Sequence, residues 1–63
     1  RSIVALEDAA RGTSFRKMRL GALRPAGGLS PMGWWDLMQH AAPADIRSGD
    51  MIADVAGHVA RDR

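Results

Sequence analysis

Cysteine and tyrosine are absent from this chain, and it has no long apolar run. Without cysteine there is no disulfide, no thiolate ligand for zinc and no thiol nucleophile, which favours a reducing, cytoplasmic compartment. No apolar run approaches the ~20 residues that a membrane-spanning helix needs, and the first residues carry no signal-peptide core. We therefore expect a soluble protein with no membrane span.

The chain is short, at 63 residues, of which 46% are hydrophobic and 25% charged. This is the composition of a folded domain, but a chain of this length removes only about 60% of its unfolded surface from water. We expect one small domain over residues 1–63, with a possible break at 24–29. Because the chain begins at Arg1, it is expected to be processed or an excerpt of a larger protein.

Charge is divided unevenly between the two halves of the chain. Residues 1–35 carry six basic and two acidic side chains, whereas residues 36–63 carry three and five. A basic half suits an acidic or polyanionic partner, although in a folded unit the two halves can also neutralise each other.

Apolar residues recur at helical spacing in four segments, 2–11, 15–23, 31–41 and 50–60. Turn and capping residues separate these segments, and no strand pattern of comparable length stands out. The predicted fold class is therefore all-α, a small bundle of three to four short helices. Gly21 and Gly57 are flaws in this prediction, because glycine costs about 1 kcal/mol relative to alanine inside a helix.

The segment from residue 28 to residue 40 is the richest in large apolar side chains and contains both tryptophans. Ser30 is placed to cap a helix, and Pro31 suits the first helical position, where its missing N–H is not needed. Trp34 and Trp35 are adjacent, so on a helix they point about 100° apart and need separate covers. Either neighbouring helices of this chain cover both, or one tryptophan anchors in a partner. The predicted partner-binding residues are Trp34, Trp35, Met32 and Met38.

A second cluster is basic and surrounds Phe15, Met18, Leu20 and Leu23. Such a segment can lie along phosphates, but basic side chains also commonly wet the outer side of an amphipathic helix. The candidate nucleic-acid contacts are Arg16, Lys17, Arg19, Arg24 and Arg47.

Two aspartate–histidine pairs share a four-residue spacing, which places both members on one side of a helix. Two such helices facing each other would offer carboxylates and imidazoles to Zn, Mn or Fe. The alternative is a simple hydrogen bond within each pair at the surface. The candidate metal ligands are Asp36, His40, Asp54 and His58.

The chain also resembles helix-turn-helix domains of the phage-repressor type over residues 19–60. Residues 19–30 look like the first helix running into the Gly-Leu-Ser that opens the second, and residues 45–49 look like the end of the recognition helix. Residues 52–60 would form the closing helix. The resemblance implies DNA binding, with one helix in the major groove.

Nothing in the sequence reaches the specificity of a catalytic signature, and no cofactor is expected. The leading hypothesis is a non-enzymatic helical module, or a small subunit of a larger assembly, that binds a protein partner or a second copy of itself. The alternatives are a DNA-binding helix-turn-helix regulator and a metal-binding helix pair.

Overall fold

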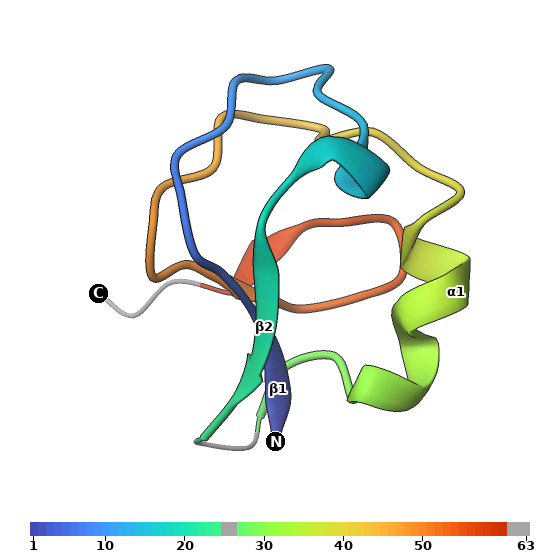
Figure 1. Ribbon diagram of the computed structural model, residues 1–63. Helices are drawn as coiled ribbons and strands as arrows, with labels where there is room; N and C mark the ends of the chain where they lie inside the picture. The colour runs from blue at the N-terminus through green and yellow to red at the C-terminus, as the bar shows by residue number, and fades with distance from the viewer. Residues whose placement is uncertain (25–26, 61–63) are drawn as a thin grey trace.

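The computed structural model describes residues 1–24 and 27–60, and in it the chain forms a small antiparallel sheet with one short α-helix beside it (Figure 1). The strand order is β2-β1-β3-β4, so the first strand of the chain lies inside the sheet. Strand β1 (Ser2–Ala5) is buried along its whole length, which suits its β-branched residues Ile3 and Val4.

Strand β2 (Leu20–Leu23) pairs with β1 over four residues, with Ile3 opposite Ala22 and Ala5 opposite Leu20. On its other side β1 pairs with β3 (Met51–Ile52), and β3 pairs with β4 (Val59–Ala60). Every pairing is antiparallel, and β2 and β4 are the outer strands of the described sheet.

Two long loops run beside each other above the sheet, and Figure 1 shows them as the blue and yellow-orange traces. Ala9 and Ile46 exchange two main-chain hydrogen bonds, of 2.8 and 2.7 Å, and Ser14 bridges to Ala41. The 3₁₀ helix η1 (Phe15–Lys17) begins where these loops meet, and the Ser14 side chain caps it by accepting from the N–H of Arg16. These bonds hold η1 against the segment that follows α1.

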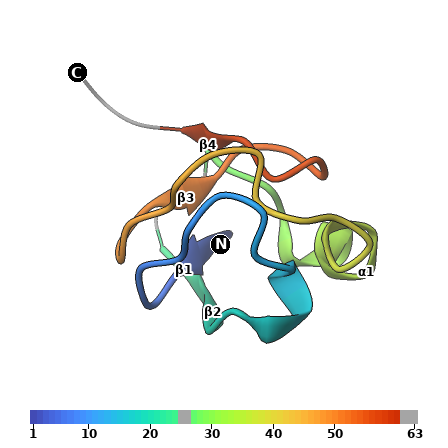
Figure 2. The ribbon, with the colours of Figure 1, turned by 90° about the horizontal axis from the view of Figure 1, so that it is seen from above.

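The second helical segment consists of the 3₁₀ helix η2 (Pro31–Gly33) followed directly by α1 (Trp34–Leu37). Figures 1 and 2 both place this segment to one side of the sheet. The largest fully buried hydrophobic side chains come from the sheet, the loops and both helical segments: Ile3, Phe15, Leu37, Ile46 and Ile52. The core therefore joins the helical segment to the sheet.

Gly57 shows how closely the loop between β3 and β4 approaches this core. Its φ of 94° lies in the left-handed region that favours glycine, and a Cβ there would overlap the ring of Phe15. The residue predicted to weaken a helix is thus required by a tight turn.

The all-α prediction is wrong. Residues predicted as helix at 2–11 form β1 and a loop, those at 15–23 form η1 and β2, and those at 50–60 form β3, a loop and β4. Ser2, the first residue of the segment predicted as helix over 2–11, is a buried strand residue whose hydroxyl accepts from the N–H of Gly28 at 3.0 Å. The helix predicted over 31–41 exists but ends earlier, at Leu37.

Short apolar runs cause this error, because four buried residues in a row suit a strand covered on both faces as well as a helix. The strands also replace two of the helices that the helix-turn-helix resemblance implies. The segment that would form its first helix contains β2, and the segment that would form its closing helix contains β3 and β4.

The predicted break at 24–29 falls partly on residues 25–26, which lie outside the described residues. Just after them, Leu29 donates to the carbonyl of Ile52 at 2.7 Å and accepts from the N–H of Ile3 at 2.9 Å. Among the described residues, no helix is long and apolar enough to cross a membrane.

Candidate functional site

The segment from Ser30 to Met38 carries all four predicted partner-binding residues. Its start is as predicted, because the Ser30 hydroxyl accepts from the N–H of Met32 at 3.2 Å and Pro31 occupies the first position of η2. Its end is held by the N–H of Met38, which donates to the carbonyl of Trp34 at 3.0 Å. The segment is thus a short, capped helical unit.

One side of this unit faces the core. Leu37 is fully buried, Met38 is 7% exposed, and Trp34 is half-buried against the same cluster. The helical spacing of three, four and seven residues predicts that Trp34 shares one side with Leu37, Met38 and Ala41, and of these Leu37 and Met38 pack with it whereas Ala41 is exposed. These side chains anchor the segment to the protein.

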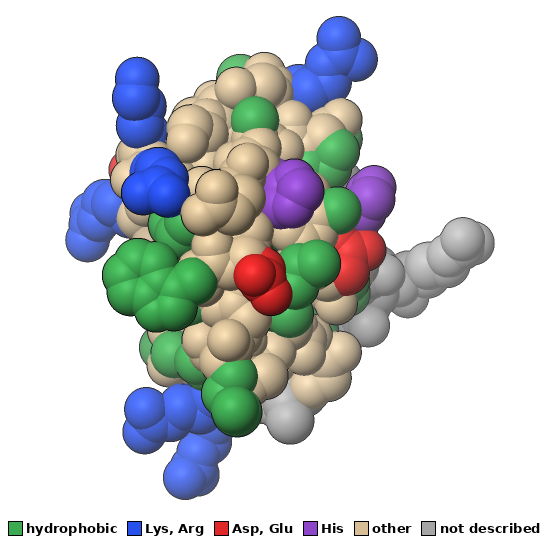
Figure 3. Space-filling model, turned by 90° about the vertical axis from the view of Figure 1, so that its right-hand side faces the viewer, with side chains coloured by type: hydrophobic (Ala, Val, Ile, Leu, Met, Phe, Trp, Pro, Cys, Tyr) green, Lys and Arg blue, Asp and Glu red, His purple; other side chains and the backbone are tan. Residues whose placement is uncertain are grey.

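The other side carries two large apolar side chains that the described residues leave exposed. Met32 is 94% exposed and Trp35 is 74% exposed. They are three positions apart in consecutive helical turns, which makes them neighbours on the helix surface. We call this pair the Met32/Trp35 patch, and Figure 3 shows hydrophobic side chains standing out on this side of the molecule.

Arg16, a predicted nucleic-acid residue, is hydrogen-bonded to this helical unit. Its Nε donates to the main-chain carbonyl of Met38 at 3.0 Å, so η1 and the end of α1 are joined through this guanidinium. Lys17 follows it in η1 and is exposed. No feature of the sequence pointed to the contact between Arg16 and Met38.

The other predicted nucleic-acid residues are spread over the molecule. Arg19 precedes β2 and Arg24 follows it, so the strand separates them by roughly 16 Å at 3.3 Å per residue. Arg47 lies in the loop before β3, where its N–H donates to Asp50 Oδ2 at 2.8 Å. Figure 3 shows Lys and Arg side chains at separate corners of this face rather than in one band.

Asp54 and His58 form the contact that their spacing predicts, but in a loop instead of a helix. Their side chains meet at 2.9 Å between Nδ1 and Oδ2, and Asp54 Oδ1 also accepts from the main-chain N–H of Ala56 and of His58, each at 3.1 Å. Because an ionised carboxylate only accepts, Nδ1 carries the proton, and in the neutral ring Nε2 is an acceptor.

These hydrogen bonds stabilise the charged form of the Asp54 carboxylate. The main-chain N–H of His58 is the largest cause that lowers the pKa of Asp54 below its usual 3.8, while partial desolvation acts in the opposite direction. The loop between β3 and β4 is thus organised around an ionised aspartate.

Asp36 and His40 belong to a different setting. Asp36 is exposed within α1, and His40 lies beyond the end of that helix, where its carbonyl accepts from Phe15 at 3.2 Å. The described residues contain no group of three or more acidic, histidine or cysteine side chains that could hold a metal ion. The opposed helix pair that the metal hypothesis requires is absent, because Asp54 and His58 are not on a helix.

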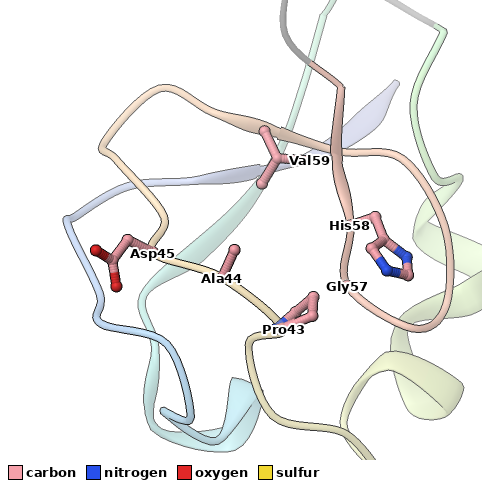
Figure 4. Close-up of a pocket in the computed structure, with 6 residues that line it drawn as sticks. All are labelled: Pro43, Ala44, Asp45, Gly57, His58 and Val59. Atoms are coloured by element: carbon pink, nitrogen blue, oxygen red, sulfur yellow. The ribbon is translucent and has the colours of Figure 1, made fainter.

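His58 also lines a pocket of about 230 Å³ with Pro43, Ala44, Asp45, Gly57 and Val59 (Figure 4). The Asp45 carboxylate points away from the His58 ring in this view, so these two groups do not converge. The lining residues include no hydroxyl that could act as a nucleophile beside His58. Sequence reasoning missed this pocket, and the one signal for it was the glycine next to His58.

Comparisons of the chain with protein-family models, with curated proteins and with solved structures give no match. The candidate site is therefore assigned from its own chemistry, and the Met32/Trp35 patch is the most distinctive surface feature of the described residues.

Proposed function

We propose that this chain is a protein-interaction module whose contact surface is the Met32/Trp35 patch. The observation that carries the proposal is that a capped helical unit presents a 74% exposed tryptophan while its opposite side is locked into the core. Tryptophan is enriched among residues that dominate binding energy, and methionine adapts to irregular apolar surfaces.

The size of the indole supports this proposal. A tryptophan side chain buries roughly 200 Å² when it is covered, which at about 25 cal/mol per Å² corresponds to several kcal/mol. A tenfold change in affinity requires only about 1.4 kcal/mol. Covering Trp35 alone can thus contribute more than a tenfold increase in affinity, even after part of it is lost to ordering the contact.

Peptide selection on the immobilised chain tests the proposal without a known partner. We expect the enriched peptides to compete with one another for one site and to lose about tenfold or more in affinity for Trp35→Ser and for Met32→Ser. Leu23→Ser is the matched control, because Leu23 is an exposed apolar residue of β2. Circular dichroism verifies that each variant is folded.

The opposite result would be peptides that bind wild type and Trp35→Ser equally well. In that case the patch is not the contact surface, and the exposed indole has no role in binding.

A further inference from the structure

The structure places a fixed cation at one end of the helical unit that bears the Met32/Trp35 patch. Arg16 Nε donates to the carbonyl of Met38, and the neighbouring Phe15 N–H donates to the carbonyl of His40. These two bonds, together with the bridge between Ser14 and Ala41, hold η1 against the residues that follow α1. Arg16 is therefore held at the end of α1 by three contacts between residues 14–16 and residues 38–41.

The guanidinium of Arg16 retains most of its binding capacity in this position. It has five N–H donors in a planar fork, and the bond to Met38 uses the one on Nε. In the part of the chain that the structure describes, neither Arg16 nor Lys17 lies within ion-pair distance of a carboxylate. Both residues are exposed. A carboxylate from outside the chain can therefore reach two cations here.

We infer that the partner is an acidic peptide segment that seats an apolar side chain on the Met32/Trp35 patch and places a carboxylate on Arg16 and Lys17. This inference rests on the proposed function and names the chemistry of the partner. The planar fork of arginine matches a carboxylate in a bidentate geometry, so Arg16 contributes direction as well as charge.

The same surface suits a nucleic acid less well. Nucleic-acid binding needs cations along a track of phosphates, whereas here Arg24 follows the far end of β2 and Arg47 lies in the loop before β3. An exposed apolar pair on a helical unit whose end is bonded to Arg16 is complementary to an acidic, amphipathic peptide.

The test uses peptides selected on the wild-type chain for binding that depends on Trp35. We expect them to carry Asp or Glu beside a large apolar residue. Versions in which Asn and Gln replace these acids should bind about fivefold to tenfold more weakly, and added salt should weaken only the acidic versions.

Variants of the chain test whether Arg16 and Lys17 cause this preference for acidic peptides. Arg16→Gln and Lys17→Gln should remove the difference between the acidic and the amide peptides, whereas Arg11→Gln, which lowers the net charge equally at another exposed position, should leave it unchanged. Arg16→Lys, which keeps the charge without the fork, should recover part of the effect.

Three results would overturn the inference. If the selected peptides are neutral or basic, or if their amide versions bind equally, the partner is not acidic, although loss of binding in Trp35→Ser would still support the interaction module. If single-stranded oligothymidylate displaces the bound peptides at a lower concentration than the free acidic peptide does, the partner is a nucleic acid. If sedimentation shows association that Trp35→Ser abolishes, the occupant is a second copy.

Discussion

The two sides of the segment 31–38 differ sharply in exposure. Trp34, Leu37 and Met38 contact the core, whereas Met32 and Trp35, on the same two turns, are largely exposed. The inner side accounts for stability, and the outer side is available for binding. Because the two sides lie on one segment of eight residues, substitutions there can separate folding from the proposed binding.

The largest effect is expected at Leu37, which is fully buried. Leu37→Ala should lower the free energy of unfolding by about 2–5 kcal/mol, because it removes buried methyl groups and leaves a cavity. A chain of this length has roughly 3–9 kcal/mol in total, so the variant should be partly unfolded at 25 °C. Urea unfolding followed by circular dichroism measures this.

Leu23→Ala is the matched control for that experiment, since the same atoms are removed from a side chain that is 45% exposed. It should cost less than about 1 kcal/mol. Equal urea midpoints for Leu37→Ala and Leu23→Ala would mean that the inner side of α1 is not packed as described.

The two tryptophans test the comparison most directly. Trp34→Ala should lower the free energy of unfolding by about 2 kcal/mol, less than a fully buried tryptophan because Trp34 is half-buried. Fluorescence gives a second measurement: Trp35→Phe, which keeps Trp34, should emit at shorter wavelength than Trp34→Phe. Identical emission spectra for these two proteins would contradict the difference between the two sides.

A substitution in the loop between β3 and β4 is expected to have a smaller effect on stability, because it removes an exposed polar contact. Asp54→Asn should lower the melting temperature slightly near neutral pH, because the folded state holds the pKa of Asp54 below its usual 3.8. Because the pKa of Asp54 is lower in the folded state, the ionised carboxylate stabilises the fold at pH values above its pKa in the unfolded state. This stabilisation is lost as the pH falls through its pKa in the folded state.

The difference in melting temperature between wild type and Asp54→Asn should therefore shrink as the pH is lowered through and below 3.8. Thermal unfolding at a series of pH values measures it, with Asp36→Asn as the control at an exposed aspartate of α1. A difference that does not change with pH would show that the contacts of the carboxylate charge do not stabilise the loop.

The smallest effect on stability is expected on the outer side of the segment. Trp35→Ser and Met32→Ser should change the free energy of unfolding by less than about 0.5 kcal/mol, because neither side chain is buried by the described residues. They should also reduce binding of hydrophobic dyes. A loss of more than about 1 kcal/mol in either variant would mean that the side chain is covered in solution.

The start of the helical segment could be predicted from local signals in the sequence. Ser30 followed by proline defines a cap and a first helical position by chemistry that depends on a few neighbouring atoms. The angle between adjacent helical residues likewise predicted that Trp34 and Trp35 face different surroundings, but not which of them would be exposed. In the same way, the contact between Asp54 and His58 was predicted, although a turn and not a helix produces it.

The sheet was not predictable from these signals. Ile3 and Val4 form a strand because β2 and β3 lie on both sides of them, and these partners are distant in the sequence. Apolar spacing in such short segments fits a helix and a buried strand equally well. Gly21 and Gly57 were the two available warnings, and both mark places where the helical prediction is wrong.

Placing β1 inside the sheet has a kinetic consequence. This strand is the first part of the described chain to be made, yet its neighbour β3 follows only after nearly all of the rest. Antiparallel pairing between such distant residues closes a long loop, which slows folding relative to local pairing. During synthesis β1 therefore remains without its full set of partners until β3 has emerged.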